Sequence, residues 1–276
     1  LGKVIHVSGF WDGKNVYLAR FAPPASGTWA WQTQASDAGM HGQRGTLTCA
    51  GNLPAEHISS RGPVQSSKLF PATLASADST PFFLLGAQLR SALNVSLPSF
   101  QKYVAARAEQ GCNFLQIAAL EQARGNNPET GEAFFANEGE RLNPDYWRRL
   151  DERVAYANAH GMVAGLTLLP KASASYFTSA EQVQRYMQYV VRRYSAFNVM
   201  WLLDEMPEGP AFARASIIAA IRAHDPAQHV LVLPHGIAPE ARRAEVAFML
   251  APEIENQARA GAERRIALQP LIAGEK

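Results

Sequence analysis

Two adjacent carboxylic acids, Asp204 and Glu205, follow the apolar run at residues 199–203. A parallel strand that is buried on both faces is apolar along its whole length, so this run predicts a buried strand that ends at the two acids. Neighbouring side chains on a strand point to opposite faces, so at most one of the acids can continue an inward-facing row. Charged residues where such a strand stops mark either a functional site or the start of a loop.

Other polar residues follow further apolar runs in the same way. They are Gln88, Arg90, Glu121, Lys171, His235 and Glu275. In a barrel of alternating strands and helices, the C-terminal ends of all strands meet at one mouth. If the chain forms such a barrel, these side chains converge there, so the chemistry depends on the fold that positions them.

The acids at 204–205 and Glu275 follow the fourth and the seventh predicted strands, which lie nearly across a barrel from each other. Their side chains could therefore approach a sugar from opposite sides. Glycoside hydrolysis needs such a pair, with one carboxylic acid to protonate the leaving oxygen and one carboxylate to attack or to activate water. A separation of about 5–5.5 Å between the carboxyl groups indicates retention of configuration.

Each candidate also has a structural alternative. A single strand-end carboxylate such as Glu205 is more often a helix cap or a salt-bridge partner, and its pairing with Glu275 is what favours catalysis. His235 could contact a substrate or be a hydrogen-bonded structural residue. Glu121 could bind a hydroxyl group or an arginine. Asp204 could orient Glu205, cap the next helix or be the acid itself.

From residue 81 onwards the sequence alternates between strand and helix patterns. Predicted helices begin after Ser96, Asn143 and Ser179, which are favourable N-cap residues, and a fourth spans 212–223. The predicted strands are the apolar runs at 81–86, 113–120, 162–169, 198–203 and 229–233, with further candidates at 246–250 and 270–276. A helix-like stretch at 252–268 separates the last two.

Repeated strand–helix units predict a parallel sheet. The preferred interpretation is an α/β fold of the (β/α)8 TIM-barrel type, with its last unit missing. A doubly wound sheet is the fallback, although no G-x-G-x-x-G or phosphate-binding loop is present in the sequence.

The first 58 residues carry a β pattern instead. Short runs at 4–7, 16–21, 28–33 and 45–49 predict strands, and the Asp12–Gly13 pair predicts a turn between the first two. Strands of this length with turns between them are typical of a β-sandwich.

We therefore predict an immunoglobulin-like β-sandwich at 1–58, a linker at 59–80 and the barrel at 81–276. Trp29 and Trp31 share one face of a predicted strand. They could pack in the sandwich core or form a sugar-stacking platform.

The composition is that of an ordinary folded protein. Of the 276 residues, 47% are hydrophobic and 18% charged, and the formal net charge is +2 with scattered Lys and Arg. We therefore expect no nucleic-acid-binding face, and no membrane span because no run of about 18 apolar residues occurs. Cys49 and Cys112 are expected to be small buried hydrophobes. Because no His, Cys and Asp cluster has metal-ligand spacing and no G-x-S-x-G motif is present, neither a metal nor a cofactor is expected.

Several segments resemble known families. GFWDGKNVYLARFAPPASGTWAWQT resembles the small β-sandwich domain that precedes many bacterial glycoside hydrolase barrels. PFFLLG, QGCNFLQIAAL, NPDYWRRLDERVAYANAHGMVAGLTLL and RRYSAFNVMWLLDE, in this order, resemble the barrel of the apiosidase-like group of clan A (β/α)8 glycosidases. The resemblance covers most of the chain. It implies a retaining glycosidase whose acid/base after strand 4 is matched by Glu205 or Asp204, and whose nucleophile after strand 7 is matched by Glu275.

The sequence departs from this family pattern in two places. Ala87-Gln88-Leu89 stands where the family usually has an Asp and a Trp, and Asp204 replaces the Gly of a Trp-x-x-Gly pattern. We therefore expect an altered sugar subsite. Its expected lining residues are Gln88, Arg90, Glu121, Trp201 and His235. Family elements before Gly2 and after strand 7 are missing, so we expect a fragment cut at both ends.

Together these features predict a glycoside hydrolase that acts on a polysaccharide or oligosaccharide and needs no cofactor. Its secreted, periplasmic or cell-surface location is implied by the resemblance alone. The alternative is a catalytically inactive carbohydrate-binding protein on a glycosidase scaffold, which the altered motif after the first strand favours. A weaker alternative is a structural module for adhesion.

Overall fold

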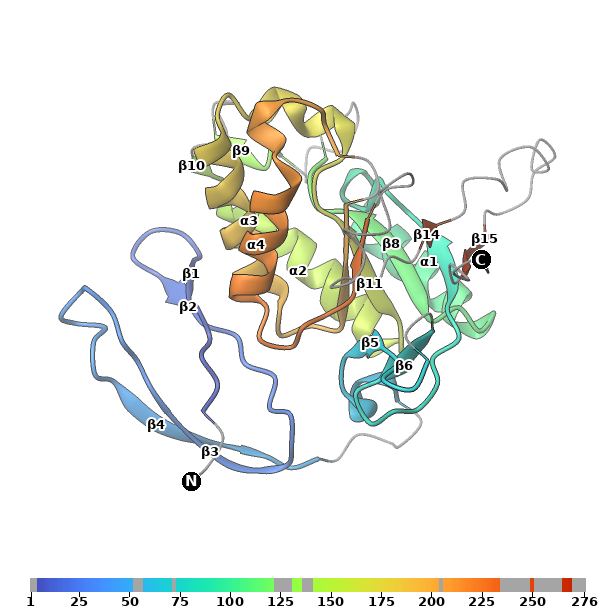
Figure 1. The fold of residues 1–276 in the computed structure, drawn as a ribbon, viewed down its shortest axis with the longest axis horizontal. Helices are drawn as coiled ribbons and strands as arrows, with labels where there is room; N and C mark the ends of the chain where they lie inside the picture. Colours follow the sequence, from blue (N-terminus) through green and yellow to red (C-terminus); the bar gives the residue numbers. More distant parts are fainter. Residues whose placement is uncertain are drawn as a thin grey trace, which may run out of the picture.

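The computed structural model describes residues 4–51, 57–70, 73–121, 131–135, 141–203, 206–233, 249–250 and 265–269. Figure 1 shows a body of strands and helices in these ranges, with N-terminal hairpins beside it. The body contains the parallel sheet that positions the candidate site.

The main sheet has the strand order β13-β12-β11-β8-β7-β15-β14. The parallel strands neighbour each other in chain order. They are β7 (Leu85–Gln88), β8 (Phe114–Ala118), β11 (Val163–Thr167), β12 (Val199–Leu202) and β13 (Leu231–Val232). Each overlaps a predicted apolar run, although β7 extends past the run at 81–86, so that Gln88 ends the strand instead of following it. The predicted parallel α/β sheet is confirmed.

Helices connect these strands at the predicted places. They are α1 (Leu97–Glu109), α2 (Pro144–Ala159), α3 (Ala180–Tyr194) and α4 (Arg214–His224). Ser96, Asn143 and Ser179 each accept a hydrogen bond from a backbone N–H of the first turn, which is why the first three helices begin there. All four helices contribute to one hydrophobic cluster on one face of the sheet. A doubly wound sheet carries helices on both faces, whereas these four helices of the described residues share one face. Sequential strands with helices on one face are the arrangement of a (β/α)-barrel wall.

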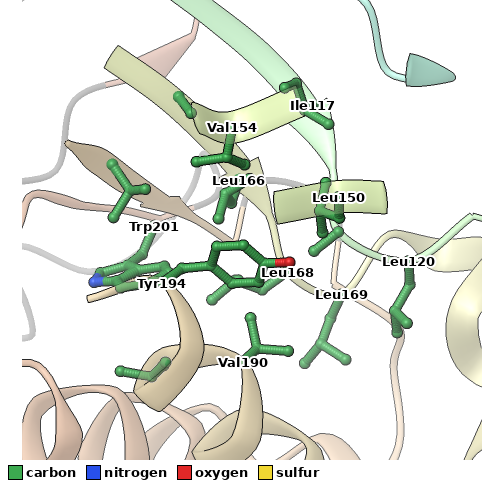
Figure 2. Packing of buried hydrophobic residues seen from close by; sticks show 14 of the residues in the cluster. Ile117, Leu120, Leu150, Val154, Leu166, Leu168, Leu169, Val190, Tyr194 and Trp201 are labelled. Carbon is green, nitrogen blue, oxygen red and sulfur yellow. The ribbon is translucent and has the colours of Figure 1, made fainter. Parts of the chain in front are cut away.

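The side chains of the parallel strands alternate between two hydrophobic clusters. Ile117, Leu166 and Trp201 belong to the cluster that faces the helices, and Figure 2 shows them beside Leu150 of α2 and Val190 of α3. Their neighbours along each strand point the other way, to the face where Phe114, Val163, Met200 and Leu202 belong to a second cluster. We call the face away from the helices the inner face of the sheet.

The inner face is closed at the N-terminal ends of the strands by a short hairpin. The hairpin consists of β5 (Val64–Ser66) and β6 (Leu74–Ser76), and its buried side chains share a cluster with Phe114 and Val163. The segment predicted as a linker, 59–80, thus holds two strands with buried residues. Strands of three residues show no visible period in a sequence rich in Gly, Pro and Ser, so no pattern predicted them.

Two antiparallel hairpins, drawn in blue in Figure 1, form the N-terminal region. They are β1 (Phe10–Trp11) with β2 (Tyr17–Leu18), and β3 (Gly27–Gln32) with β4 (Arg44–Cys49). The second hairpin matches the predicted strands, and the turn at Asp12–Gly13 is confirmed, with Gly13 at φ +102°. The strand predicted at 4–7 is wrong, because β1 begins at Phe10. The hairpins belong to separate two-stranded sheets, and a packed sandwich stays a prediction.

The two tryptophans of β3 lie at the surface or partly buried. Trp29 packs edge-on against Phe21, with 5.2 Å between ring centroids. Trp31 is 44% exposed and its indole ring lies over Gly45 of β4. Neither is in a core cluster of the described residues.

The first hairpin is fastened to the helices by a buried charged cluster. Phe10 is 3% exposed, and the guanidinium groups of Arg20 and Arg193 lie over its ring, 5.0 and 4.8 Å from the centroid. Arg193 of α3 donates to Asp12 at 2.8 Å and also pairs with Asp151 of α2 at 2.6 Å. These contacts anchor β1 and the turn that follows it to α2 and α3.

Two short strands add an antiparallel edge to the main sheet. β15 (Arg265–Gln269) pairs with β7, and β14 (Met249–Leu250) pairs with β15. The helix predicted at 252–268 is therefore wrong at residues 265–268. β15 satisfies the backbone groups at the edge of β7 that does not pair with β8. The last predicted strand, at 270–276, lies outside the described residues.

The remaining short elements lie in the connections. They are β9 (Phe134–Phe135), β10 (Arg141–Leu142) and the 3-10 helices η1 (Ile58–Arg61), η2 (Ala92–Asn94), η3 (Lys171–Tyr176) and η4 (Pro210–Phe212). β9 and β10 pair within the long connection that follows β8. In the part of the chain that the structure describes, no helix is long and apolar enough to span a bilayer.

Candidate active site

On three of the five parallel strands the inner face carries polar side chains in place of hydrophobic ones. Gln88, Gln116 and Thr167 stand on the neighbouring strands β7, β8 and β11, with Gln88 and Gln116 in register. The side-chain amides of Gln88 and Gln116 are hydrogen-bonded at 3.3 Å, and the Gln116 amide lies 2.9 Å from Oγ1 of Thr167. Gln116 and Thr167 are each 1% exposed, whereas Gln88 is half-buried. We call these three residues the polar row.

An aromatic ring fills the inner face next to the polar row. Gly165 of β11 pairs in register with Gln116, and a Cβ at Gly165 would lie 2.2 Å from Cζ of Phe114. The glycine is required because the ring of Phe114 occupies the space of its missing side chain. The inner face thus carries polar groups on β7, β8 and β11, whereas on β12 and β13 Leu202 and Val232 keep it hydrophobic to the strand ends.

Arg90 joins the polar row from the segment that follows β7. Its guanidinium contacts the side-chain amide of Gln88. Its backbone carbonyl accepts a hydrogen bond from the N–H of Ala118 at 3.2 Å, which ties this segment to β8. The structure therefore brings together the predicted site residues Gln88 and Arg90.

Glu121 supports the turn after β7. Its carboxylate, in a residue that is 8% exposed, accepts hydrogen bonds from the N–H of Leu93 at 3.2 Å and from Nδ2 of Asn94 at 2.8 Å. Burial raises the pKa of Glu121 to about 8 in spite of these hydrogen bonds. The carboxylate thus holds the turn that follows Arg90, and its predicted contact with a sugar stays a prediction.

A buried arginine holds the same turn from the opposite side. Arg153 of α2 is 2% exposed, and its Nε donates to the carbonyl of Ala92 while its Nη2 donates to the carbonyl of Val95, both at 2.8 Å. Glu121 and Arg153 therefore satisfy backbone groups at both ends of η2. Fully bonded polar networks of this kind make a loop rigid.

The connections that follow β8 and β11 are also joined. The hydroxyl group of Tyr176 in η3 donates to Oε2 of Glu132 at 2.5 Å. Burial, together with the Glu132 carboxyl group, raises the pKa of Tyr176. The phenol stays protonated at neutral pH and can keep this contact between the two connections.

Trp201 does not lie with the polar row, although it was predicted to line the sugar site. Its side chain is fully buried in the cluster between sheet and helices, as Figure 2 shows. Its Nε1 donates to Oδ2 of Asp225 at 2.9 Å, and Oδ1 of Asp225 is 2.8 Å from Nδ1 of His229. Strand alternation explains the placement, because Trp201 precedes Leu202 of the inner face.

Four other predicted site residues lie outside the described residues. They are Asp204, Glu205, His235 and Glu275. The strand before the two acids is described, and residues 199–203 are all buried, as the apolar run predicted. The catalytic roles assigned to the acids stay predictions.

Gln116 and Thr167 are site residues that sequence reasoning did not single out. Each interrupts an apolar strand, in FLQIA and VAGLT respectively. A polar residue among the inward-facing residues of a strand indicates such a site. In the sequence it can be recognised only after the inward-facing and outward-facing residues of the strand have been assigned.

The described site consists of amide, hydroxyl and guanidinium groups. Among the described residues, no group of three or more His, Cys, Asp or Glu side chains could hold a metal ion. Fold and site together define an α/β protein with a parallel sheet that carries a row of polar side chains on β7, β8 and β11. A family model described as "Apiosidase-like, catalytic domain" matches residues 72–250. The chain belongs to this apiosidase-like family of glycoside hydrolases, as the sequence resemblance implied.

A second family model, described as a domain of unknown function (DUF5060), matches residues 1–36. Comparison with curated proteins found no match. Among solved structures, a candidate glycoside hydrolase from Bacteroides vulgatus ATCC 8482 is similar with a TM-score of 0.70 and 19% identity, over 87% of this chain and 51% of that one. A glycoside hydrolase family 5 protein from the same organism has a TM-score of 0.55 and 16% identity, over 66% of this chain and 41% of that one. The chain thus spans about half the length of the first structure, and identities this low show the fold alone.

Proposed function

We propose that this chain carries the catalytic domain of a retaining glycoside hydrolase that acts on a polysaccharide or oligosaccharide. In this proposal the sheet closes into a (β/α)8 barrel, Glu205 is the acid/base and Glu275 is the nucleophile. The observation that carries the proposal is the polar row on β7, β8 and β11, on a face that the β5–β6 hairpin covers at Phe114 and Val163. Family membership supports the class of reaction.

The chemistry of the polar row suits a neutral sugar. Each sugar hydroxyl group both donates and accepts hydrogen bonds, and amide and hydroxyl side chains also do both. In the proposed reaction one carboxylic acid protonates the leaving oxygen while the second carboxylate attacks the anomeric carbon. Water then cleaves the glycosyl-enzyme ester with help from the first residue, now acting as a base. Secretion to the periplasm or the cell surface, where polysaccharides occur, is part of the proposal.

The first experiment is a substrate panel with the purified protein. Aryl glycosides of pentoses and hexoses are offered, with an apioside first because of the name of the family. Release of the coloured phenol measures turnover, and proton NMR of the first-formed anomer shows whether configuration is retained. A parent protein that binds sugars but cleaves none would favour the inactive carbohydrate-binding alternative.

Matched acid-to-amide variants then assign the roles. Glu205→Gln and Glu275→Gln are expected to lower kcat by about a hundredfold or more, because each removes a group that transfers a proton or forms a bond. Asp204→Asn serves as the control at the adjacent position and is expected to retain more activity than Glu205→Gln. The reverse order would move the acid/base to Asp204.

A further inference from the structure

A chain of four polar side chains crosses three neighbouring strands on the inner face. Arg90 contacts the amide of Gln88, Gln88 contacts Gln116 at 3.3 Å, and Gln116 contacts Oγ1 of Thr167 at 2.9 Å. We call this chain the relay. We propose that Gln116 and Thr167 are positioning residues of the sugar site, which act through the relay to fix the amide of Gln88 so that its NH2 group is offered to an oxygen of the substrate. The inference rests on the proposed function, and it assigns roles to two buried residues of the strands.

Which group donates and which accepts at each hydrogen bond of the relay follows from the atoms that each side chain offers. A guanidinium donates only and has no acceptor, so Gln88 must present its amide oxygen to Arg90. The amide atom of Gln88 that faces Arg90 is also the atom that faces Gln116. Gln116 must therefore donate to it through its NH2 group. An amide's oxygen and nitrogen exchange places by a half-turn of the side chain, so this network decides the orientation.

The same reasoning continues to Thr167. As placed in the structure, Nε2 of Gln116 faces Oγ1 of Thr167 at 2.9 Å. The relay therefore requires the Gln116 amide to make the same half-turn as that of Gln88, after which its oxygen accepts from the threonine hydroxyl group. Every link then has one donor and one acceptor. The charge on Arg90 thus sets the direction of three consecutive hydrogen bonds.

The relay determines what Gln88 offers to a ligand. With its oxygen turned to Arg90 and Gln116, its nitrogen points away from both and makes no hydrogen bond within the part of the chain that the structure describes. Gln88 is half-buried, whereas Gln116 and Thr167 are 1% exposed, so Gln88 is the member within reach of a ligand. An amide N–H pair in this position recognises an acceptor oxygen, such as a sugar hydroxyl group. A substrate that lacks this hydroxyl group would bind more weakly.

The kinetic test uses shape-conserving variants. Thr167→Val and Gln116→Leu each break the relay without removing Gln88, and each is expected to raise KM for the best aryl glycoside about tenfold with a smaller change in kcat. Thr167→Ser, which keeps the hydroxyl group, should stay within about threefold of the parent. A purely structural role would instead lower thermal stability and leave KM unchanged.

A double-mutant comparison shows whether the effect passes through Gln88. In a Gln88→Ala background the relay has nothing to orient, so adding Gln116→Leu should change kcat/KM no further. If Gln116→Leu lowered kcat/KM equally in the parent protein and in Gln88→Ala, the relay would be overturned. This comparison depends on turnover by the parent protein.

A spectroscopic test does not need turnover. The side-chain NH2 signals of Gln88 are identified by NMR as those absent in Gln88→Ala. Thr167→Val should shift them, although Thr167 and Gln88 stand on strands separated by β8. Unshifted signals in a folded Thr167→Val protein would refute the relay. Shifted signals in a protein that cleaves no glycoside would support the relay while the proposed function fails.

Discussion

The guanidinium of Arg193 in α3 donates a hydrogen bond to the carboxylate of Asp12 at 2.8 Å, although 181 positions separate the two residues. Arg193 is fully buried and also pairs with Asp151 of α2. Its side chain therefore joins the N-terminal hairpin to two helices of the body. Because a buried charge that loses a partner is costly, this contact couples the folding of both parts.

Removal of the Asp12 carboxylate tests this coupling. Asp12→Ala is expected to lower the free energy of unfolding by about 3 kcal/mol, because it leaves the buried Arg193 with incomplete compensation. Urea unfolding measures the change. Asp145→Ala is the matched control, because Asp145 pairs with Arg148 at the surface, and we expect a loss of at most about 1 kcal/mol. Equal losses in the two variants would contradict the coupling.

The buried carboxyl group of Glu121 predicts a dependence of stability on pH. Burial raises its pKa from 4.5 to about 8 in the folded protein. Between these values the folded state holds a proton that the unfolded state has lost, so the free energy of unfolding contributed by this group falls as pH rises through that window. Glu121→Gln should therefore flatten the fall in stability between pH 5 and pH 8, as measured by urea unfolding.

The control for this experiment is Glu181→Gln. Glu181 is exposed at the start of α3, and a backbone hydrogen bond lowers its pKa, so it is ionised in both states throughout the window. The control should keep the pH dependence of the parent. The same slope in the parent, Glu121→Gln and Glu181→Gln would show that Glu121 is ionised in the folded protein.

The contact between Phe114 and Gly165 predicts a local steric effect. Gly165→Ala places a methyl group where the ring of Phe114 lies, so we expect a loss of about 2 kcal/mol in the free energy of unfolding. Thermal unfolding measures the loss. Adding Phe114→Leu should recover part of the loss, because leucine leaves room for the methyl group. An unchanged melting temperature in Gly165→Ala would show that the ring can leave this place freely.

The placement of Trp201 predicts separate effects on stability and on substrate binding. Trp201→Phe removes the donor to Asp225, so we expect a loss of about 1–3 kcal/mol in the free energy of unfolding. KM should not change, because the ring faces the helices. Gln88→Ala should show the opposite pattern, with a raised KM and nearly unchanged stability. A raised KM in Trp201→Phe would return this residue to the sugar site.

The helices and parallel strands could be predicted because their signals are local. Ser96, Asn143 and Ser179 satisfy backbone groups within the same turn, and a cap of this kind can be read from a few residues. Strands buried on both faces are apolar throughout, which made the runs at 163–167 and 199–202 visible. The β5–β6 hairpin and β15 depend on partners far along the chain, so no local pattern predicted them.

The candidate site was only partly predictable for a related reason. Gln88 and Arg90 could be proposed because they follow an apolar run, and position after a strand is a local signal. Gln116 and Thr167 lie within strands. A polar residue there indicates a site only when it is known which face of the sheet its side chain points to. Trp201 precedes the two acids by a few residues, but the alternation of its own strand turns it away from the polar row.

The hairpin of β5 and β6 also decides where this chain can be divided. Val64 and Leu74 cover the inner face at Phe114 and Val163, yet they precede the first parallel strand. A recombinant protein that starts at residue 81 would expose Phe114 and Val163 to water and is expected to aggregate. Any exchange of the N-terminal region for a different one, in the laboratory or between genes, preserves the packing of the parallel sheet only if the junction lies before Val64.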